Sequence, residues 1–289
     1  MRGAALYIAA MSVVTRFAPS PTGYLHLGHA YSALLAHSVA RERGGRFLLR
    51  IEDIDRGRCR AGFTEAIEDD LSWLGVAWDG GVRKQSEHLD DYRAALARLE
   101  AMALIYPCFC TRAAIKAELE AAVAAPHDAP PVYPGTCRAL PESERHARIR
   151  QGLPYALRLD IAKAQAKAGP LFWEDEIKGA VEAAPTRHGD VVLARKDTPT
   201  SYHLAVTVDD ALQGVTLVTR GEDLFSATDI HRLLQALLGY PTPLYRHHKL
   251  LTDASGKRFA KRDKAVTLRG LRAIGKTPDE VRAMAGYPE

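Results

Sequence analysis

The sequence lacks long apolar runs and has few cysteines, and both absences narrow the classes of protein to which it can belong. No apolar stretch reaches the roughly 20 residues that a membrane-spanning helix requires, so we expect no membrane partner. The chain has 4 cysteines among 289 residues, which does not fit a small fold held together by disulfides.

The remaining composition is that of an ordinary globular protein. Apolar residues make up 47% of the chain and charged residues 26%, and the length suffices for one large or two modest domains. The net charge of +4 permits a nucleic-acid partner without arguing for one. The apolar run Ala4–Met11 is short and has no cleavage site of small residues after it. We therefore expect residues 1–12 to be a disordered extension of a cytoplasmic protein, with Met11 as an alternative start.

Residues 13–29 form the most informative stretch. A short β-type run is followed by a Pro/Gly turn and then by a long segment with apolar periodicity, which predicts a strand, a rigid turn and a helix N-terminus. Such a corner favours phosphate binding, because free backbone N–H groups and the helix dipole point at the ligand. His26 and His29 share one helical face, and Gly28 leaves room for a flat base against the backbone. The His-x-Gly-His tetrapeptide alone is a weak sign, but the strand and turn before it strengthen it.

The next elements predict a β-α-β unit. A helical pattern over residues 29–43 leads to a buried strand, Arg46–Ile51, which implies a parallel sheet. Ligands of such sheets bind beyond the carboxyl ends of the strands. Arg16 and Glu52 each fall at one of these ends, so we expect both at the site. Helical patterns follow over residues 63–74 and 86–102.

The pattern changes near residue 104. Tyr106–Cys110 is typical of a turn, and a third amphipathic segment carries Ile115, Leu119 and Val123. A Pro-rich loop and short strand-like pieces follow, at 155–159, 172–177 and 191–194. A strand over 215–219 and a helix over 228–238 indicate a return of the sheet, whereas the type of 202–210 stays open. The expected organisation is an extension over 1–12, a first catalytic half over 13–103, an insertion over 104–195, a second catalytic half over 196–248, and a loop with a short tail over 249–289.

Three of the cysteines suit a zinc ion because thiolates are preferred zinc ligands. They are Cys108, Cys110 and Cys137. The residues alone leave the fourth ligand open among His127, Asp128, Tyr133 and a water, with His127 favoured on chemistry. The alternative is a set of free buried cysteines. A zinc ion here would be structural and would hold a Pro-rich loop that has little core of its own.

The segment Arg246–Arg272 carries a concentration of positive charge. It contains nine lysines and arginines against two aspartates, which indicates an anion-binding surface or, alternatively, a solvated loop.

Two of these segments resemble the signatures of class I aminoacyl-tRNA synthetases. The stretch Arg16–His29 resembles the ATP-binding signature, and its opening Arg-Phe-Ala-Pro-Ser-Pro-Thr-Gly resembles that of the glutamyl branch. Gly256–Arg262 stands where the family carries Lys-Met-Ser-Lys-Ser. Lys261 matches its second lysine, whereas Arg258 and Ala260 replace its first lysine and its middle serine. The resemblance implies an α/β fold, a Rossmann-like parallel-sheet catalytic domain carrying a zinc-bearing insertion.

The resemblance also implies the site residues. ATP, with Mg²⁺, would be bound by His26, Gly28, His29 and Lys261, of which His26, His29 and Lys261 would be catalytic. Glutamate would be bound by Arg16, Phe17, Ala18, Pro19, Ser20, Glu52, Tyr202 and Arg220. The chemistry is consistent, since an arginine fork suits a carboxylate and the carboxylate of Glu52 suits an ammonium group.

The pattern C-x-C…Y-x-x-x-C, with Tyr133 before Cys137, resembles that of the glutamyl-Q tRNA(Asp) synthetases, as does a chain that ends without an anticodon-binding part. That family attaches glutamate to the cyclopentene-diol of queuosine at the wobble position of tRNA(Asp). The resemblance implies Tyr133 as the fourth zinc ligand, tRNA(Asp) carrying queuosine as the partner, and a monomer. We retain as alternatives a conventional glutamyl-tRNA synthetase charging the 3′ end, another HxGH adenylyltransferase, and a silent tRNA-binding relic.

Overall fold

The computed structural model describes residues 12–111, 113, 133–195, 198–251 and 267–287. Some sequence predictions concern residues outside these ranges. These are the extension up to residue 11, the amphipathic segment 115–123, His127 and Asp128 as zinc ligands, and the second signature with Arg258, Ala260 and Lys261.

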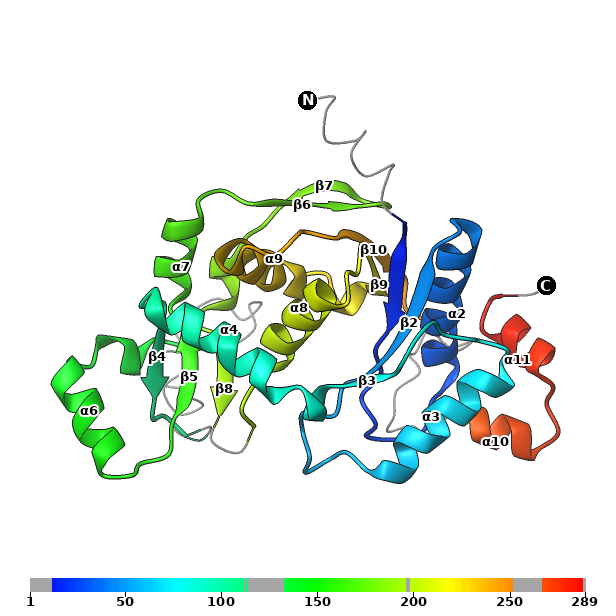
Figure 1. The fold of residues 1–289 in the computed structure, drawn as a ribbon, viewed down its shortest axis with the longest axis horizontal. Helices are drawn as coiled ribbons and strands as arrows, with labels where there is room; N and C mark the ends of the chain where they lie inside the picture. The colour runs from blue at the N-terminus through cyan, green and yellow to red at the C-terminus, as the bar shows by residue number, and fades with distance from the viewer. Residues whose placement is uncertain (1–11, 112, 114–132, 196–197, 252–266, 288–289) are drawn as a thin grey trace, which may run out of the picture.

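Helices and strands alternate along most of the described chain (Figure 1). In order they are β1 Val14–Phe17, α2 Leu27–Glu42, β2 Arg46–Ile51, α3 Ala61–Trp73, β3 Arg83–Lys84, α4 Leu89–Ala101, β4 Ile105–Cys108, α6 Glu142–Arg150, β5 Ala156–Leu159, α7 Ile161–Ala168, β6 Phe172–Asp175, β7 Gly179–Glu182, β8 Val192–Arg195, α8 Tyr202–Leu212, β9 Leu217–Gly221, α9 Ala227–Leu238, β10 Leu244–His248, α10 Leu268–Ala273 and α11 Pro278–Met284.

The predicted parallel sheet is confirmed. The strands β1, β2 and β3 run parallel in the order β1-β2-β3, and a four-stranded sheet has the order β7-β6-β10-β9 with β9, β10 and β6 parallel. The two sheets meet where β1 lies beside the start of β9, since the Thr216 N–H donates to the Val14 carbonyl at 3.0 Å. This junction brings the carboxyl ends of β1, β2, β9 and β10 to one side of the molecule.

A separate antiparallel sheet has the order β4-β5-β8 and lies at the far end of the molecule, next to α6 (Figure 1). Its strand β4 corrects the prediction of a turn at Tyr106–Cys110. Pro107 favoured the turn, but β4 is an edge strand, where proline is tolerated because one side of the strand needs no ladder hydrogen bond.

The interval 104–195 contributes to both parts of the fold. The strands β4, β5 and β8 form the antiparallel sheet, whereas the hairpin β6–β7 joins β10 in the larger sheet. The interval also holds two helices, α6 and α7, that the sequence analysis did not predict. The helix α6 buries none of its residues and so carries no apolar stripe in its sequence.

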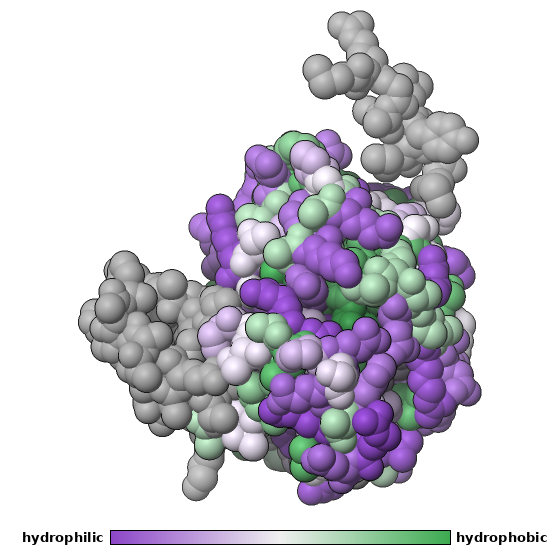
Figure 2. Space-filling model, turned by 90° about the vertical axis from the view of Figure 1, so that its left-hand side faces the viewer, coloured by the Kyte–Doolittle hydropathy of each residue, from purple (hydrophilic) through white to green (hydrophobic). Residues whose placement is uncertain are grey.

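The end of the molecule at which α6 lies has a mixed surface. Figure 2 shows polar and apolar residues interspersed on the visible part of this face, and Ile149, Leu153 and Tyr155 are exposed there. Within the described ranges, no helix combines the length and the apolar character that crossing a bilayer would require.

Candidate active site

A cavity of about 590 Å³ opens at the carboxyl ends of β1, β2 and β9. It brings together every sequence-predicted glutamate and ATP residue that the structure describes. These are Arg16, Phe17, Ala18, Pro19, Ser20, His26, Gly28, His29, Glu52, Tyr202 and Arg220. The sequence analysis missed further lining residues, among them Ser32, Thr219, Asp223 and His248. Lys261 lies outside the described residues.

The two histidines of the first signature cap the helix α2. Nδ1 of His26 accepts a hydrogen bond from the backbone N–H of Gly28 at 3.1 Å, and Nδ1 of His29 accepts from the N–H of His26 at 3.2 Å. The two rings lie 3.8 Å apart between centroids. Because both Nδ1 atoms are acceptors, a neutral ring carries its proton on Nε2. The helix N-terminus thus offers imidazole donors and its dipole to an anion.

The two predicted arginines are fixed by other residues. Arg16 forms a bidentate pair with Asp210 at 3.0 and 3.3 Å and donates to the Thr219 carbonyl at 3.2 Å. Arg220 donates to His247 at 3.0 Å and to Thr228 at 2.5 Å. A guanidinium has five N–H donors, so each arginine keeps donors beyond these bonds while its position is set.

Buried imidazoles support Arg220. Burial and the neighbouring guanidinium hold the pKa of His231 well below its usual range and lower that of His247 to about 4. Both rings are therefore neutral at pH 7, and Nε2 of His247 can accept from Arg220. Nδ1 of His247 lies 2.7 Å from the carboxylate of Asp175, which fixes the ring from its other side.

Glu52 lies at the end of β2 with its carboxylate in the cavity. Burial raises the pKa of Glu52 to about 7, against the effect of Arg50 and Arg16, which lower it. Its nearest cation is Arg50, whose Nη2 lies 3.5 Å from Oε1 of Glu52.

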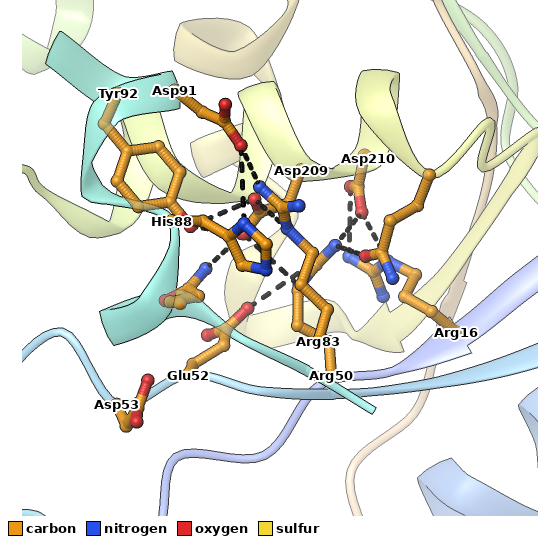
Figure 3. A network of polar contacts seen from close by, with 12 residues as sticks. Arg16, Arg50, Glu52, Asp53, Arg83, His88, Asp91, Tyr92, Asp209 and Asp210 are labelled. Carbon is orange, nitrogen blue, oxygen red and sulfur yellow. Dashed lines mark hydrogen bonds and ion pairs between the residues drawn. The ribbon is translucent and has the colours of Figure 1, made fainter. Parts of the chain in front are cut away.

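The sequence analysis missed the network behind Glu52, which Figure 3 shows. Arg50 is completely buried and pairs with Asp210 at 2.8 Å. Asp209, also completely buried, accepts from Arg83 and Gln85 at 2.8 Å and from Tyr92 at 3.0 Å. The available signals were an arginine within an apolar strand and two aspartates within an apolar helix, since buried charges are rare without partners.

The predicted zinc ligands lie together away from this cavity. The sulfur atoms of the three cysteines Cys108, Cys110 and Cys137 lie within 4.8 Å of one another. The hydroxyl of Tyr133 lies 3.3 Å from Sγ of Cys108 and 3.7 Å from Sγ of Cys110. Zinc–sulfur bonds of ~2.3 Å place tetrahedral sulfur ligands about 3.8 Å apart. Three sulfurs and one oxygen at these distances therefore fit a zinc ion.

A family model described as the catalytic domain of class I tRNA synthetases (E and Q) matches residues 12–283. The chain belongs to this class I synthetase family. Among the curated class I synthetases, the "Glutamyl-Q tRNA(Asp) synthetase" of Rhodobacter capsulatus is 50% identical, over 95% of this chain and 100% of the relative. The one from Symbiobacterium thermophilum is 46% identical, over 94% of this chain and 85% of the relative.

Solved structures of class I synthetases agree. A glutamate tRNA ligase from Elizabethkingia meningosepticum, crystallised in complex with its amino acid, matches with a TM-score of 0.79 and 28% identity. The match covers 95% of this chain and 60% of that one. The α/β fold and the synthetase family predicted from the two signatures are thereby confirmed.

Proposed function

We propose that this protein activates glutamate with ATP and transfers it to the cyclopentene-diol of queuosine at the wobble position of tRNA(Asp). The observation that carries the proposal is the cavity in which the predicted glutamate and nucleotide residues meet. The relative from Rhodobacter capsulatus, which this chain matches over the relative's whole length, bears the name of this activity.

In the activation step, an oxygen of the glutamate α-carboxylate attacks the α-phosphorus of ATP. The bond between that phosphorus and the oxygen bridging to the β-phosphate breaks, and pyrophosphate leaves. His26 and His29, on the N-terminal turn of α2, donate hydrogen bonds to the phosphates. Lys261 supplies a further positive charge. Bound with ATP, a Mg²⁺ ion would offset part of the triphosphate charge.

Arg16, Arg220 and Glu52 would orient glutamate for this attack. The amino acid brings two carboxylates and one ammonium group, and these three side chains present two fixed guanidinium groups and one carboxylate to the cavity. Because each arginine is held by its own partners, little side-chain entropy is lost when glutamate binds. Fixed charges of this kind promote reaction mainly by positioning. In the second step a queuosine hydroxyl attacks the carbonyl carbon of the adenylate, and AMP leaves.

We propose further that Cys108, Cys110, Tyr133 and Cys137 hold a structural zinc ion. Cys108 ends the edge strand β4, and Cys137 lies in a short 3₁₀ turn far along the chain. A bound ion would tie these segments together where few apolar side chains do so, since the buried residues of the local cluster are Tyr106 and two of the cysteines.

The first prediction tests the tRNA target with two tRNA pools, one from cells that make queuosine and one from cells that cannot. We expect labelled glutamate to enter only the queuosine pool and, after nuclease digestion, to remain with the anticodon fragment. Equal labelling of both pools at the 3′ end would instead indicate a conventional glutamyl-tRNA synthetase. A His29→Ala variant serves as the control for label that does not depend on activation.

A further inference from the structure

Behind Glu52 lies a buried charge cluster whose centre is Arg50. The guanidinium of Arg50 is completely buried and has three carboxylates within 4 Å. Asp210 lies at 2.8 Å, Glu52 at 3.5 Å and Asp209 at 3.8 Å. Figure 3 shows these side chains converging from β2 and from α8. Arg50 does not line the cavity, so it acts on a bound amino acid only through its neighbours.

The two aspartates have other cationic or hydrogen-bonding partners. Asp210 is also paired with Arg16, and Asp209 also accepts from Arg83 and Tyr92. Within the described chain, the ion pair of Glu52 is the one with Arg50. Loss of Arg50 would therefore leave both aspartates partnered and would leave Glu52 without its nearest cation.

The geometry of the Arg50–Glu52 contact is that of a charge interaction. Nη2 of Arg50 is buried and has no hydrogen-bond acceptor among the described residues. Its separation of 3.5 Å from Oε1 of Glu52 nevertheless gives a strong attraction, because little water screens it there. Asp210 holds Nη1 of the same guanidinium at 2.8 Å, which directs Nη2 at Glu52.

We propose that Arg50, fixed by Asp209 and Asp210, is a positioning residue that keeps Glu52 charged and directed at the ammonium group of the amino-acid substrate. This inference rests on the proposed function, in which the cavity binds glutamate.

The charges that face Glu52 give the direction of the expected pH dependence. Arg16 on β1 and Arg50 on β2 lower the pKa of Glu52, whereas burial, Asp209 and Asp210 raise it to about 7. Tyr202 lies close enough for Glu52 to raise the pKa of its phenol. The wild-type protein should therefore bind glutamate more tightly as the pH rises through about 7, when Glu52 loses its proton.

The second prediction concerns Arg50→Gln, with glutamate affinity measured by calorimetry between pH 6 and pH 9. Without the cation, the pKa of Glu52 rises further. The midpoint, which is the pH at the middle of the rise in glutamate affinity, should therefore move up by at least about one pH unit. At pH 7 this weakens binding at least about fivefold, and the loss should shrink toward pH 9. Arg50→Lys should shift the midpoint less than Arg50→Gln does, because lysine keeps the positive charge. The matched control Arg46→Gln removes an exposed arginine from the same strand and should leave the midpoint unchanged.

Asp210→Asn distinguishes an effect of charge on the pKa of Glu52 from a loss of affinity caused by disturbed structure. Asp210 raises the pKa of Glu52, so its neutralisation should move the midpoint below 7, opposite to Arg50→Gln. If Arg50→Gln does not fold, Arg50→Lys decides the inference, because it keeps the buried charge but changes its distance from Glu52 and should raise the midpoint by less than about one pH unit. Equal midpoints in the wild type and the folded variants would overturn the role of Arg50. Absence of glutamate binding by the wild type, together with no labelling of either tRNA pool, would instead overturn the proposed function.

Discussion

Gly28 lies between the two capping histidines, and the structure gives a specific reason for a glycine there. A Cβ at this position would lie 3.1 Å from Cε1 and 3.2 Å from Nδ1 of His26. Its backbone N–H donates to that same Nδ1. The glycine therefore makes room for the ring of His26, in addition to the nucleotide that the proposed function would place there.

The third prediction is that Gly28→Ala raises the KM for ATP in pyrophosphate exchange about tenfold, because the ring of His26 must shift away from the helix N-terminus. The lost cap should also cost about 1 kcal/mol of stability. Gly62→Ala is the matched control, since Gly62 is a helical glycine whose added Cβ would meet no atom within 4 Å. It should leave the KM unchanged and slightly stabilise the protein. An unchanged KM in Gly28→Ala would contradict the role given to His26.

The residues of the site divide into those that a sequence can reveal and those that it cannot. Arg16 lies near the end of β1 and Glu52 directly follows β2, so topology alone places them together. Asp210 instead reaches the site from 194 residues away in the chain. Its partner Arg50 points into the protein from an apolar strand. No local pattern predicts such a pair, because its members become neighbours only when helix α8 packs against the sheet.

At the level of elements, the end of β4 and the short turn that carries Cys137 pack around a small cluster. Apart from Tyr106, the buried members of that cluster are Cys108 and Cys137. A zinc ion on these residues would therefore supply much of the local stability.

The fourth prediction follows from this small cluster. Cys137→Ser should remove most of the zinc found by elemental analysis and should lower the melting temperature by several degrees, as should a chelator added to the wild type. Cys59→Ser is the matched control, because Cys59 lies outside the cluster, and it should keep both zinc and melting temperature. Full zinc content in Cys137→Ser would contradict the ligand assignment.

The elements that the sequence did not predict also have physical explanations. The helix α6 carries no apolar stripe that a sequence pattern could reveal, because it lies on the surface and none of its residues is buried. The sequence did not decide between helix and strand for residues 202–210, which form most of α8, because the β-branched residues there favour a strand. The side chain of Ser201 caps the N-terminus of α8, and seven of its residues are buried, which decides for the helix. Long, periodic elements such as α2 and α9 were predictable, because each buries apolar residues at helical spacing.

At the scale of the whole molecule, the two halves of the parallel sheet join at the contact of Val14 with Thr216. The Val14 N–H donates to Oγ1 of Thr216 at 2.9 Å, and the Thr216 N–H returns a bond to the Val14 carbonyl. A side-chain hydroxyl thus takes the place of a strand acceptor at the junction.

The fifth prediction is that Thr216→Val lowers the free energy of unfolding by about 1–3 kcal/mol in urea, since it leaves the Val14 N–H without its acceptor. Thr216→Ser keeps the hydroxyl and should retain most of the stability. An unchanged stability in Thr216→Val together with a loss in Thr216→Ser would show that the methyl group, not the hydrogen bond, matters at this junction.

The same junction sets when the amino-acid site can exist during synthesis. Arg16 donates to the carbonyl of Thr219, which lies 203 residues later in the chain. A nascent chain that has displayed only its first half outside the ribosome thus carries Arg16, Arg50 and Glu52 but lacks Asp210 and Thr219, which fix the two arginines. If the cavity binds glutamate as proposed, glutamate can bind only after the second half emerges and cannot assist the early stages of folding. Its stabilising effect would then be confined to the finished protein.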